Sequence, residues 1–394
     1  MVTVASRSEK LSFILLIALI IWIPIPLGGN RPWAWSLFQS SIVLQTLLLC
    51  WAYRYSLPVD RLKPLIPVIV PLLLFQFVTA LQLVPLPLEV LRTISPAAAE
   101  AYSYVGDGRY PTSLDPAQTE ISLWLGISYV LLILNVACTV SSRSRVTAVL
   151  YAIVLSGTLQ AFYAAMLVLS DLKESPVFGF PVNNGANGSF VYRNHLANYL
   201  LLAISMGLGC IISQLSVDRT KDWNLRLKRL VLTLLSPKLL VRLCLIIMVI
   251  ALVMTRSRMG NSALVIVTVS GAVLAFIAYK QRPKVLTLLM TSLLVIDALI
   301  MGAIFGLEKV KERITNTVIE QEARPDIFAW SMEAIKDFPL VGTGAGSFYS
   351  IFPAYHQQNI PVFVDHAHNE YIQFVIEYAL SLHYCSSCQC YMYW

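Results

Sequence analysis

The chain has 394 residues, of which 57% are hydrophobic and only 13% are charged. A soluble domain carries about 25% charged residues, so this composition excludes an ordinary soluble protein and indicates an integral membrane protein. The formal net charge of +7 would also suit a nucleic-acid partner. We expect no such partner, because the basic residues cluster where membrane topology requires them.

Apolar segments recur along the chain, and a bilayer-spanning helix needs about 20 mostly apolar residues. We therefore expect an all-α polytopic membrane protein with about ten transmembrane helices. The nine expected spans are residues 11–29, 33–53, 64–84, 121–140, 147–170, 194–215, 239–255, 259–279 and 285–306, and a tenth helix starts near Ala367. The first segment lacks a small-residue cleavage site, so we interpret it as a retained helix and not as a signal peptide.

The distribution of basic residues predicts the orientation of these spans. With a cytoplasmic N-terminus, more than half of the 29 Lys and Arg residues fall in short cytoplasmic loops, as the positive-inside rule requires. Those loops are residues 1–10, 54–63, 141–146, 216–242 and 280–284. The outer side then carries the loops 85–120 and 171–193, the short connection 255–260 and the long segment 307–365. Within the first of these, the LVPLPLEVL run suggests a short interfacial helix.

The stretch VNNGANGSFVYRNHLANYL, residues 182–200, combines a turn-forming Asn/Gly segment with the start of a helix. Arg193, Asn194 and His195 occupy that start, and the free N–H groups of a helix N-terminus favour anions. We therefore take these three residues as candidates for substrate binding. The alternative is a plain helix cap with an interfacial tyrosine and arginine.

The connection TRSRMG, residues 255–260, places Arg256 and Arg258 at the membrane surface between two apolar helices. Arginine is always charged and binds phosphate oxygens bidentately, so a phosphate ligand at headgroup depth would explain the pair. The alternative is snorkelling of both side chains to lipid phosphates. Farther along, Asp297 lies in the middle of the ninth span. An acid at that depth marks a functional or an interior-facing position, and its partner is not evident.

The segment 307–365 is the only substantial stretch that we expect outside the membrane. Arg324 precedes a helix-like run that Pro339 should end. The following GTGAGSF is rich in glycine, but it lacks the Lys-Ser/Thr of a P-loop and follows no strand, which excludes a nucleotide site. We predict a tight turn packed on the membrane domain.

The motif DHAHNEYIQF, residues 365–374, brings Asp365, His366, His368 and Glu370 to the mouth of an apolar segment. Histidine is the side chain best matched to proton transfer near neutral pH, so we expect a catalytic histidine here. On a helix, the two histidines would point about 200° apart, which disfavours a shared metal, whereas His366, Glu370 and Glu377 would share a face. Metal binding and a purely structural polar cluster remain the alternatives.

Four motifs in a fixed order resemble those of the O-antigen ligase and polymerase superfamily: GSFVYRNHLANYL, TRSRMG, ARPDIFAWSMEAIKDFPLVGTGAGSF and DHAHNEYIQFVIEYAL. LQLVPLPLEVLRTISP and SLDPAQTE are also similar to segments of that group, and the resemblance covers roughly residues 10–380. It implies a metal-independent and cofactor-free glycosyltransferase of the C-type membrane fold, in the bacterial inner membrane with its active site facing the periplasm.

The resemblance also implies the reaction and the residues that perform it. The donor would be a glycan on undecaprenyl diphosphate, and the acceptor would be a lipid A core sugar or another glycan, as in lipopolysaccharide and exopolysaccharide biosynthesis. Arg258 matches a phosphate-contacting arginine, Arg324 the arginine that opens the long periplasmic loop, and His368 the histidine that acts on the acceptor hydroxyl. Arg256, Asp365, His366 and Glu370 are further candidates for substrate binding.

The chain departs from the family after Glu377, where the family continues with a glycine-containing helix and further spans. Here Cys385, Cys388 and Cys390 follow within a short tail, which we interpret as a truncated or frame-shifted end in preference to a metal site. The expected division is a transmembrane bundle (1–306), a periplasmic loop region (307–365), an incomplete tenth helix (366–382) and an aberrant Cys-rich tail (383–394). The alternative function is a transporter or a lipid-linked glycan flippase, although transporters often show two related halves and no internal repeat is visible here.

Overall fold

The computed structural model describes residues 7–170, 172–177, 179–181, 185–213, 237–278, 291, 295, 318–356 and 364–379. The chain forms two compact units, of which unit 1 comprises Met1–Leu48 with Thr139–Val310 and unit 2 comprises Leu49–Cys138 with Lys311–Trp394. Most of the expected ninth span (285–306), Asp297 within it, and the Cys-rich tail (383–394) lie outside the described residues. The described elements are helices, apart from one pair of two-residue strands.

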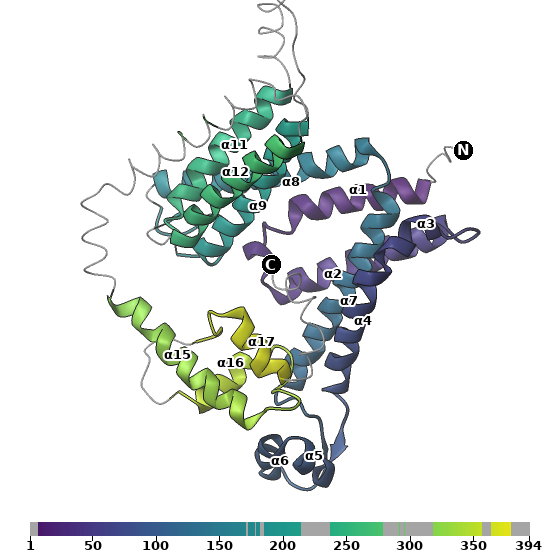
Figure 1. Cartoon of the computed structure of the whole chain (residues 1–394), viewed down its shortest axis with the longest axis vertical. Coiled ribbons are helices and arrows are strands. Elements are labelled where there is room, and N and C mark those ends of the chain that lie inside the picture. Colours follow the sequence, from purple (N-terminus) through teal and green to yellow (C-terminus); the bar gives the residue numbers. More distant parts are fainter. Residues whose placement is uncertain are drawn as a thin grey trace, which may run out of the picture. The chain divides into compact units, whose positions relative to one another are not determined.

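Unit 1 is a helical bundle. Its described helices are α1 (Arg7–Trp22), most of α2 (Pro32–Ala52), α8 (Arg143–Leu169), α9 (Arg193–Ser213), α11 (Pro237–Met254) and α12 (Arg258–Ala278), with the short 3-10 turn η1 (Leu27–Gly29). Helices α8, α9 and α11 pack on one another, while α12 packs on α9 and α1 packs on α8 (Figure 1).

Small residues allow the close approach of these helices. Gly157 of α8 faces Ala203 and Met248, where an added Cβ would lie only 2.5 Å from the Ala203 side chain. Gly207 of α9 likewise faces Leu245 of α11. Glycine at such crossings is typical of helices that associate in a membrane, because packing contacts have to supply the attraction there.

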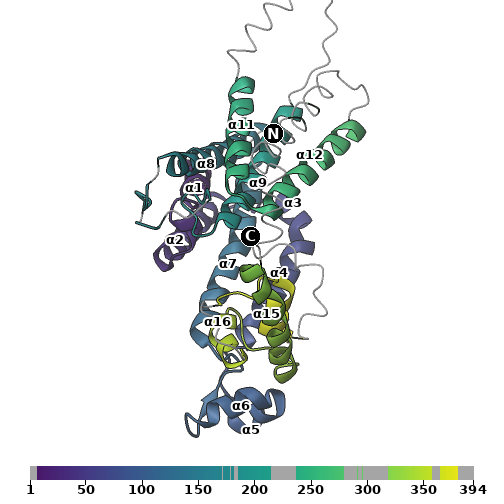
Figure 2. The ribbon, with the colours of Figure 1, turned by 90° about the vertical axis from the view of Figure 1, so that its left-hand side faces the viewer.

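Unit 2 combines long helices with shorter elements. It contains α3 (Val59–Leu62), η2 (Lys63–Leu65), α4 (Ile66–Leu81), α5 (Leu88–Ile94), α6 (Pro96–Ser103), most of α7 (Pro116–Thr139), α15 (Val318–Asp337), α16 (Phe348–Ile351), η3 (Phe352–Ala354) and α17 (Glu370–Tyr378). Strands β1 (Leu86–Pro87) and β2 (Arg109–Tyr110) pair antiparallel. Helices α15 and α17 pack together, in the yellow-green and yellow part of the ribbon (Figure 2). The core beneath them includes Trp330, Phe348 and Phe352.

Six helices in the described part of the chain are long and apolar enough to cross a membrane. They are Pro32–Ala52, Val59–Leu81, Pro116–Thr139, Arg143–Leu169, Arg193–Ser213 and Met259–Ile277. Each coincides with one of the expected spans. Leu239–Met254 is a shorter apolar helix, and α1 ends at Trp22, earlier than expected, because the chain turns through Pro24 and Pro26.

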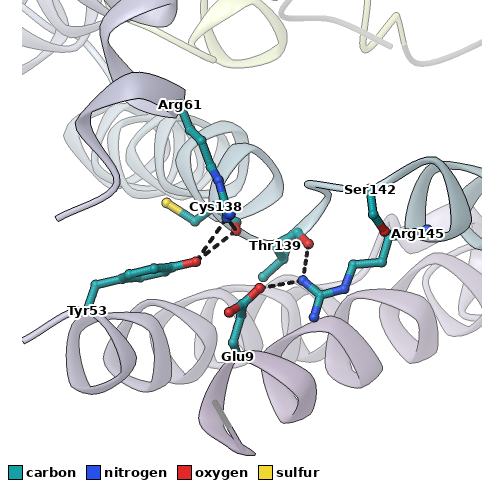
Figure 3. Close-up of polar contacts among 7 residues, drawn as sticks. All are labelled: Glu9, Tyr53, Arg61, Cys138, Thr139, Ser142 and Arg145. Atoms are coloured by element: carbon teal, nitrogen blue, oxygen red, sulfur yellow. Dashed lines mark hydrogen bonds and ion pairs between the residues drawn. The ribbon is translucent and has the colours of Figure 1, made fainter. Parts of the chain in front are cut away.

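Two arginines from the loops that we counted as cytoplasmic bind helix-terminal carbonyls (Figure 3). In unit 1, Arg145 donates to the Thr139 carbonyl and to Glu9, with an Nη1–Oε1 distance of 2.5 Å to the carboxylate. In unit 2, Arg61 donates to the Cys138 carbonyl at 2.7 Å and to the Tyr53 hydroxyl at 3.0 Å. The last carbonyls of a helix lack partners within it and carry partial negative charge, so cations are favoured there.

Candidate functional site

Within unit 1, the turn between α11 and α12 holds Arg256 in a left-handed conformation. Its φ is 56°, and its N–H donates to the Val253 carbonyl at 3.0 Å. This geometry terminates α11, but the position normally suits glycine, since a side chain there costs about 1–2 kcal/mol. The Arg256 side chain is exposed. The turn therefore exposes a charged side chain even though its backbone conformation is unfavourable for a residue other than glycine.

The next residue, Ser257, caps α12. The hydroxyl of Ser257 accepts the N–H of Gly260 at 3.2 Å, which is the bond of an N-terminal cap. The first residue of α12 is Arg258. The connection is therefore reduced to a left-handed residue followed by a cap, which places two arginines at the positive end of a 21-residue helix.

The loop before α9 packs against this same turn. The Ala186 N–H donates to the Met254 carbonyl at 3.1 Å, and an added Cβ on Gly185 would lie 3.0 Å from the Thr255 oxygen and 3.4 Å from the Arg193 side chain. The structure thus brings Arg193 beside the Thr255–Gly260 turn. The two sequence motifs, residues 185–195 and 255–260, are far apart in the chain and lie together at one end of unit 1.

The starts of α9 and α12 also lie side by side. An added Cβ on Gly260 would lie 2.8 Å from the Ala197 side chain. Asn194 and His195 are exposed in the first turn of α9, and the His195 ring packs edge-on against Tyr192 at 5.5 Å. This end of unit 1 therefore gathers two helix N-termini with Arg193 and Arg256, an arrangement that can bind an anion.

Buried polar side chains lie beneath these motifs. Ser189 donates to the Pro24 carbonyl at 2.7 Å and pairs with Gln160. The side-chain Oδ1 of Asn187 and the side-chain Oδ1 and Nδ2 of Asn261 are buried and have no hydrogen-bond partner. Buried amides normally have hydrogen-bond partners. These side chains are exceptions, and they leave unused hydrogen-bonding groups inside unit 1 near its arginine-bearing end.

Within unit 2, the DHAHNEYIQF motif forms a turn followed by a helix. Helix α17 begins at Glu370, and the Asn369 side chain caps it by accepting the N–H groups of Tyr371 and Ile372. His368 precedes the cap with a left-handed φ of 52°. The expected helical face shared by His366, Glu370 and Glu377 is therefore wrong, because residue 366 lies before the helix.

The turn exposes most of its polar side chains. His366, His368 and Glu370 are exposed, and His366 lies 4.0 Å from the half-buried Asp365 carboxylate. By contrast, Glu377 is fully buried on the inner face of α17. Among the described residues, no three His, Cys, Asp or Glu side chains gather into a group that would hold a metal ion.

The GTGAGSF segment forms a tight turn against the end of α17. The Thr343 and Gly344 N–H groups donate to the Ile376 and Glu377 carbonyls at 2.9 and 3.1 Å. Gly342, Gly344 and Gly346 all have positive φ values. An added Cβ on Gly342 would lie 2.3 Å from the Glu377 carbonyl oxygen, so only glycine fits this close approach of two backbones.

Gln82, directly after α4, joins three segments through its buried side-chain amide. Its Nε2 donates to the Val341 and Glu377 carbonyls, and its Oε1 accepts the Ala345 N–H. Across the same turn, the Thr119 hydroxyl of α7 donates to the Ala345 carbonyl at 2.9 Å. We name the segment 341–347 with these partners the glycine clasp. It fixes the end of α17 to α4 and α7.

Sequence reasoning missed the parts of the clasp that come from distant segments. Gln82 and Thr119 carry no local signal for the clasp, because the clasp residues that they bind lie more than 200 residues away. Gln373 and Glu377 did offer one, since an i, i+4 pair of polar side chains on an otherwise apolar helix face is a recognisable interaction. Arg324 was expected before a helix, but α15 begins at Val318 and continues through Pro325.

Comparison with known proteins addresses the identity of this region. A family model described as O-antigen ligase matches residues 243–378. The matched stretch contains TRSRMG, the ARPDIF segment, the glycine clasp segment and DHAHNEYIQF, whereas Arg193, Asn194 and His195 lie outside it. This part of the chain is therefore similar to the O-antigen ligase family. No curated protein and no solved structure matches the chain.

The match and the six apolar helices of the described part of the chain support a multi-pass membrane protein of the O-antigen ligase or polymerase type, with a role in polysaccharide biosynthesis. Its matched residues extend over both units, since Arg258 belongs to unit 1, and Arg324 and His368 belong to unit 2. The family assignment agrees with the resemblance inferred from the motifs alone.

Proposed function

We propose that this protein is a periplasmic-face glycosyltransferase of the bacterial inner membrane, with a cytoplasmic N-terminus, that moves a glycan from undecaprenyl diphosphate to a sugar hydroxyl. The observation that carries the proposal is the O-antigen ligase match over residues 243–378, which includes Arg258, Arg324 and His368. The basic, donor-rich end of unit 1 supports it, because a lipid diphosphate needs such partners.

In this reaction the acceptor oxygen attacks the anomeric carbon of the donor glycan. A bond forms between these two atoms, and the bond from the anomeric carbon to the diphosphate oxygen breaks, with inversion at the carbon. His368 accepts the proton of the attacking hydroxyl, a contribution typically worth about 10²–10⁴-fold in rate. The exposure of the His368 side chain in the turn before α17 suits a group that has to meet a substrate.

The leaving group is undecaprenyl diphosphate, which gains negative charge as the bond breaks. Arg258 and Arg324 neutralise that charge, while Arg256 and Arg193 bind the diphosphate from the helix starts of unit 1. Fixed cationic donors stabilise developing charge more effectively than water does, because they need no reorganisation. Asn194, His195, Asp365, His366 and Glu370 complete the proposed set of substrate-binding residues. The chemistry requires neither a metal nor a cofactor.

Complementation tests the proposal in a strain that lacks its own surface-polysaccharide ligase. The chain and its His368→Ala, Arg258→Ala and Arg324→Ala variants are expressed at equal levels, and attached glycan is measured by gel. We expect transfer by the wild type and loss of transfer by each variant. His356→Ala and the exposed Arg109→Ala serve as matched controls, since neither residue has a proposed role.

The products distinguish the possible activities. Glycan attached to lipid A core identifies a ligase, and an altered chain length without attachment identifies a polymerase. Retained transfer in the His368→Ala variant would overturn the role of the imidazole. If lipid-linked glycan instead accumulates on the cytoplasmic leaflet when the gene is deleted, the transporter or flippase alternative replaces the proposal.

A further inference from the structure

A chain of side-chain hydrogen bonds runs from the turn of His368 to the glycine clasp. The N–H of Ala367 donates to the Oε1 of Gln373 at 3.2 Å, and the Nε2 of Gln373 donates to the Oε1 of Glu377 at 3.2 Å. The N–H of Gly346 then donates to the Oε2 of Glu377 at 2.9 Å. Both ends of the chain are therefore backbone groups, one of them adjacent to His368.

These bonds have only one workable polarity. A backbone N–H can donate but not accept, so the groups facing Ala367 and Gly346 have to be acceptors. The Gln373 amide therefore presents its oxygen to Ala367 and its NH₂ group to Glu377. Consequently both oxygens of Glu377 act as acceptors in this arrangement.

This series of hydrogen bonds stabilises a backbone conformation of His368 that is otherwise unfavourable. His368 lies between the Ala367 N–H, which Gln373 holds, and Asn369, which caps α17. Its φ of 52° costs about 1–2 kcal/mol for a residue with a side chain. Without the Gln373 bond, the residue can return to ordinary φ values, and the Cα–Cβ bond that aims the imidazole would then change direction.

We propose that Gln373 and Glu377 are positioning residues that fix the direction of the His368 imidazole for proton transfer. Glu377 anchors the hydrogen-bond chain in the clasp, and Gln373 transmits that anchor to the His366–Ala367 peptide, one residue ahead of His368. This inference rests on the proposed role of His368. A positioning residue does not need to touch the substrate, which agrees with the full burial of Glu377.

An exchange of the two side chains tests the proposal. In Glu377→Gln, the new NH₂ group faces a donor, either the Gly346 N–H or the Gln373 NH₂ group. In Gln373→Glu, two carboxyl groups face each other. The double variant Gln373→Glu/Glu377→Gln restores every donor–acceptor pair. The carboxylate introduced at position 373 accepts from the Ala367 N–H and from the amide introduced at position 377, whose oxygen accepts from the Gly346 N–H. Glu100→Gln, an exposed site on α6, controls for the chemical change.

Each variant is purified in detergent and assayed with undecaprenyl-diphosphate-linked glycan extracted from the encoding strain. Each single variant should lower the maximal rate by about tenfold or more, the scale of a misplaced catalytic group. The half-saturating donor concentration should stay unchanged, because ground-state binding is not altered. The double variant should recover to within about threefold of wild type, and folded yield should be equal throughout.

The His368→Ala variant, assayed in parallel, separates the two proposals. If it is inactive while both single variants match wild type, the positioning role is wrong and the proposed function stands. Single variants that lose folded protein, or a double variant that fails to recover, also overturn the positioning role. Activity in the His368→Ala variant overturns the role of the histidine and the inference with it.

Discussion

Gly342→Ala tests the glycine clasp most directly. The added methyl group would lie 2.3 Å from the Glu377 carbonyl oxygen and 2.5 Å from the Tyr378 nitrogen. Both obstacles are backbone atoms, so a side-chain rotation cannot relieve the overlap. Ordinary contacts begin at 3.4 Å, and the two backbones therefore have to separate by about 1 Å, the difference between the two distances.

The cost of this separation follows from the bonds that it breaks. The N–H groups of Thr343 and Gly344 would lose the Ile376 and Glu377 carbonyls, at about 1 kcal/mol net for each bond. An alanine at φ 70° adds about 1–2 kcal/mol of backbone strain. The expected total is about 3–4 kcal/mol, which corresponds to a thermal midpoint lower by about 10 °C for a unit of this size.

The assay is thermal unfolding of the purified protein in detergent, followed by size-exclusion chromatography with fluorescence detection. The matched control is Gly179→Ala, because Gly179 has a similar φ of 64° but no atom within 4 Å of an added Cβ. That variant should show the strain alone, about 1–2 kcal/mol. Equal midpoints for the two variants would refute the reasoning that the close backbone approach makes Gly342 necessary.

Three further predictions concern unit 1 and use the same unfolding assay. Arg256→Gly should keep or raise the free energy of unfolding, by up to about 1 kcal/mol, because it relieves the strain at φ 56°. Glycan transfer in the complementation assay should fall, and a lower thermal midpoint would contradict the strain argument. Ser257→Ala should cost about 1 kcal/mol through the lost N-terminal cap of α12, and Ser270→Ala on the exposed face of the same helix should be neutral by comparison. Glu9→Ala should cost about 1–3 kcal/mol, because the half-buried Arg145 loses its ion-pair partner and keeps the Thr139 carbonyl. The Glu9→Ala/Arg145→Ala double variant should cost less than the sum of the two single variants, whereas additive costs would argue against a coupled pair.

The sequence predicted the location of the polar motifs better than it predicted the backbone conformation of their residues. It placed the Arg193 loop and TRSRMG on one side, and the structure packs Arg193 beside the Thr255–Gly260 turn. It also predicted a tight turn at GTGAGSF. It misplaced the start of α17 by about one turn, because Asn369 is the cap and the preceding residues are not helical.

The sequence by itself determined the apolar helices and the motifs that name the family, since both are local patterns: a spanning helix needs an unbroken apolar stretch, and each motif is a short run of residues. Only the tertiary structure decided which polar residues support the site. Gln82, Thr119, Gly346 and Glu377 converge from segments separated by up to about 300 residues, and hydrogen bonds between such segments leave no periodicity in the chain. Their geometry depends on how the helices pack, because buried donors and acceptors generally need partners, and in the glycine clasp folding brings those partners from distant segments.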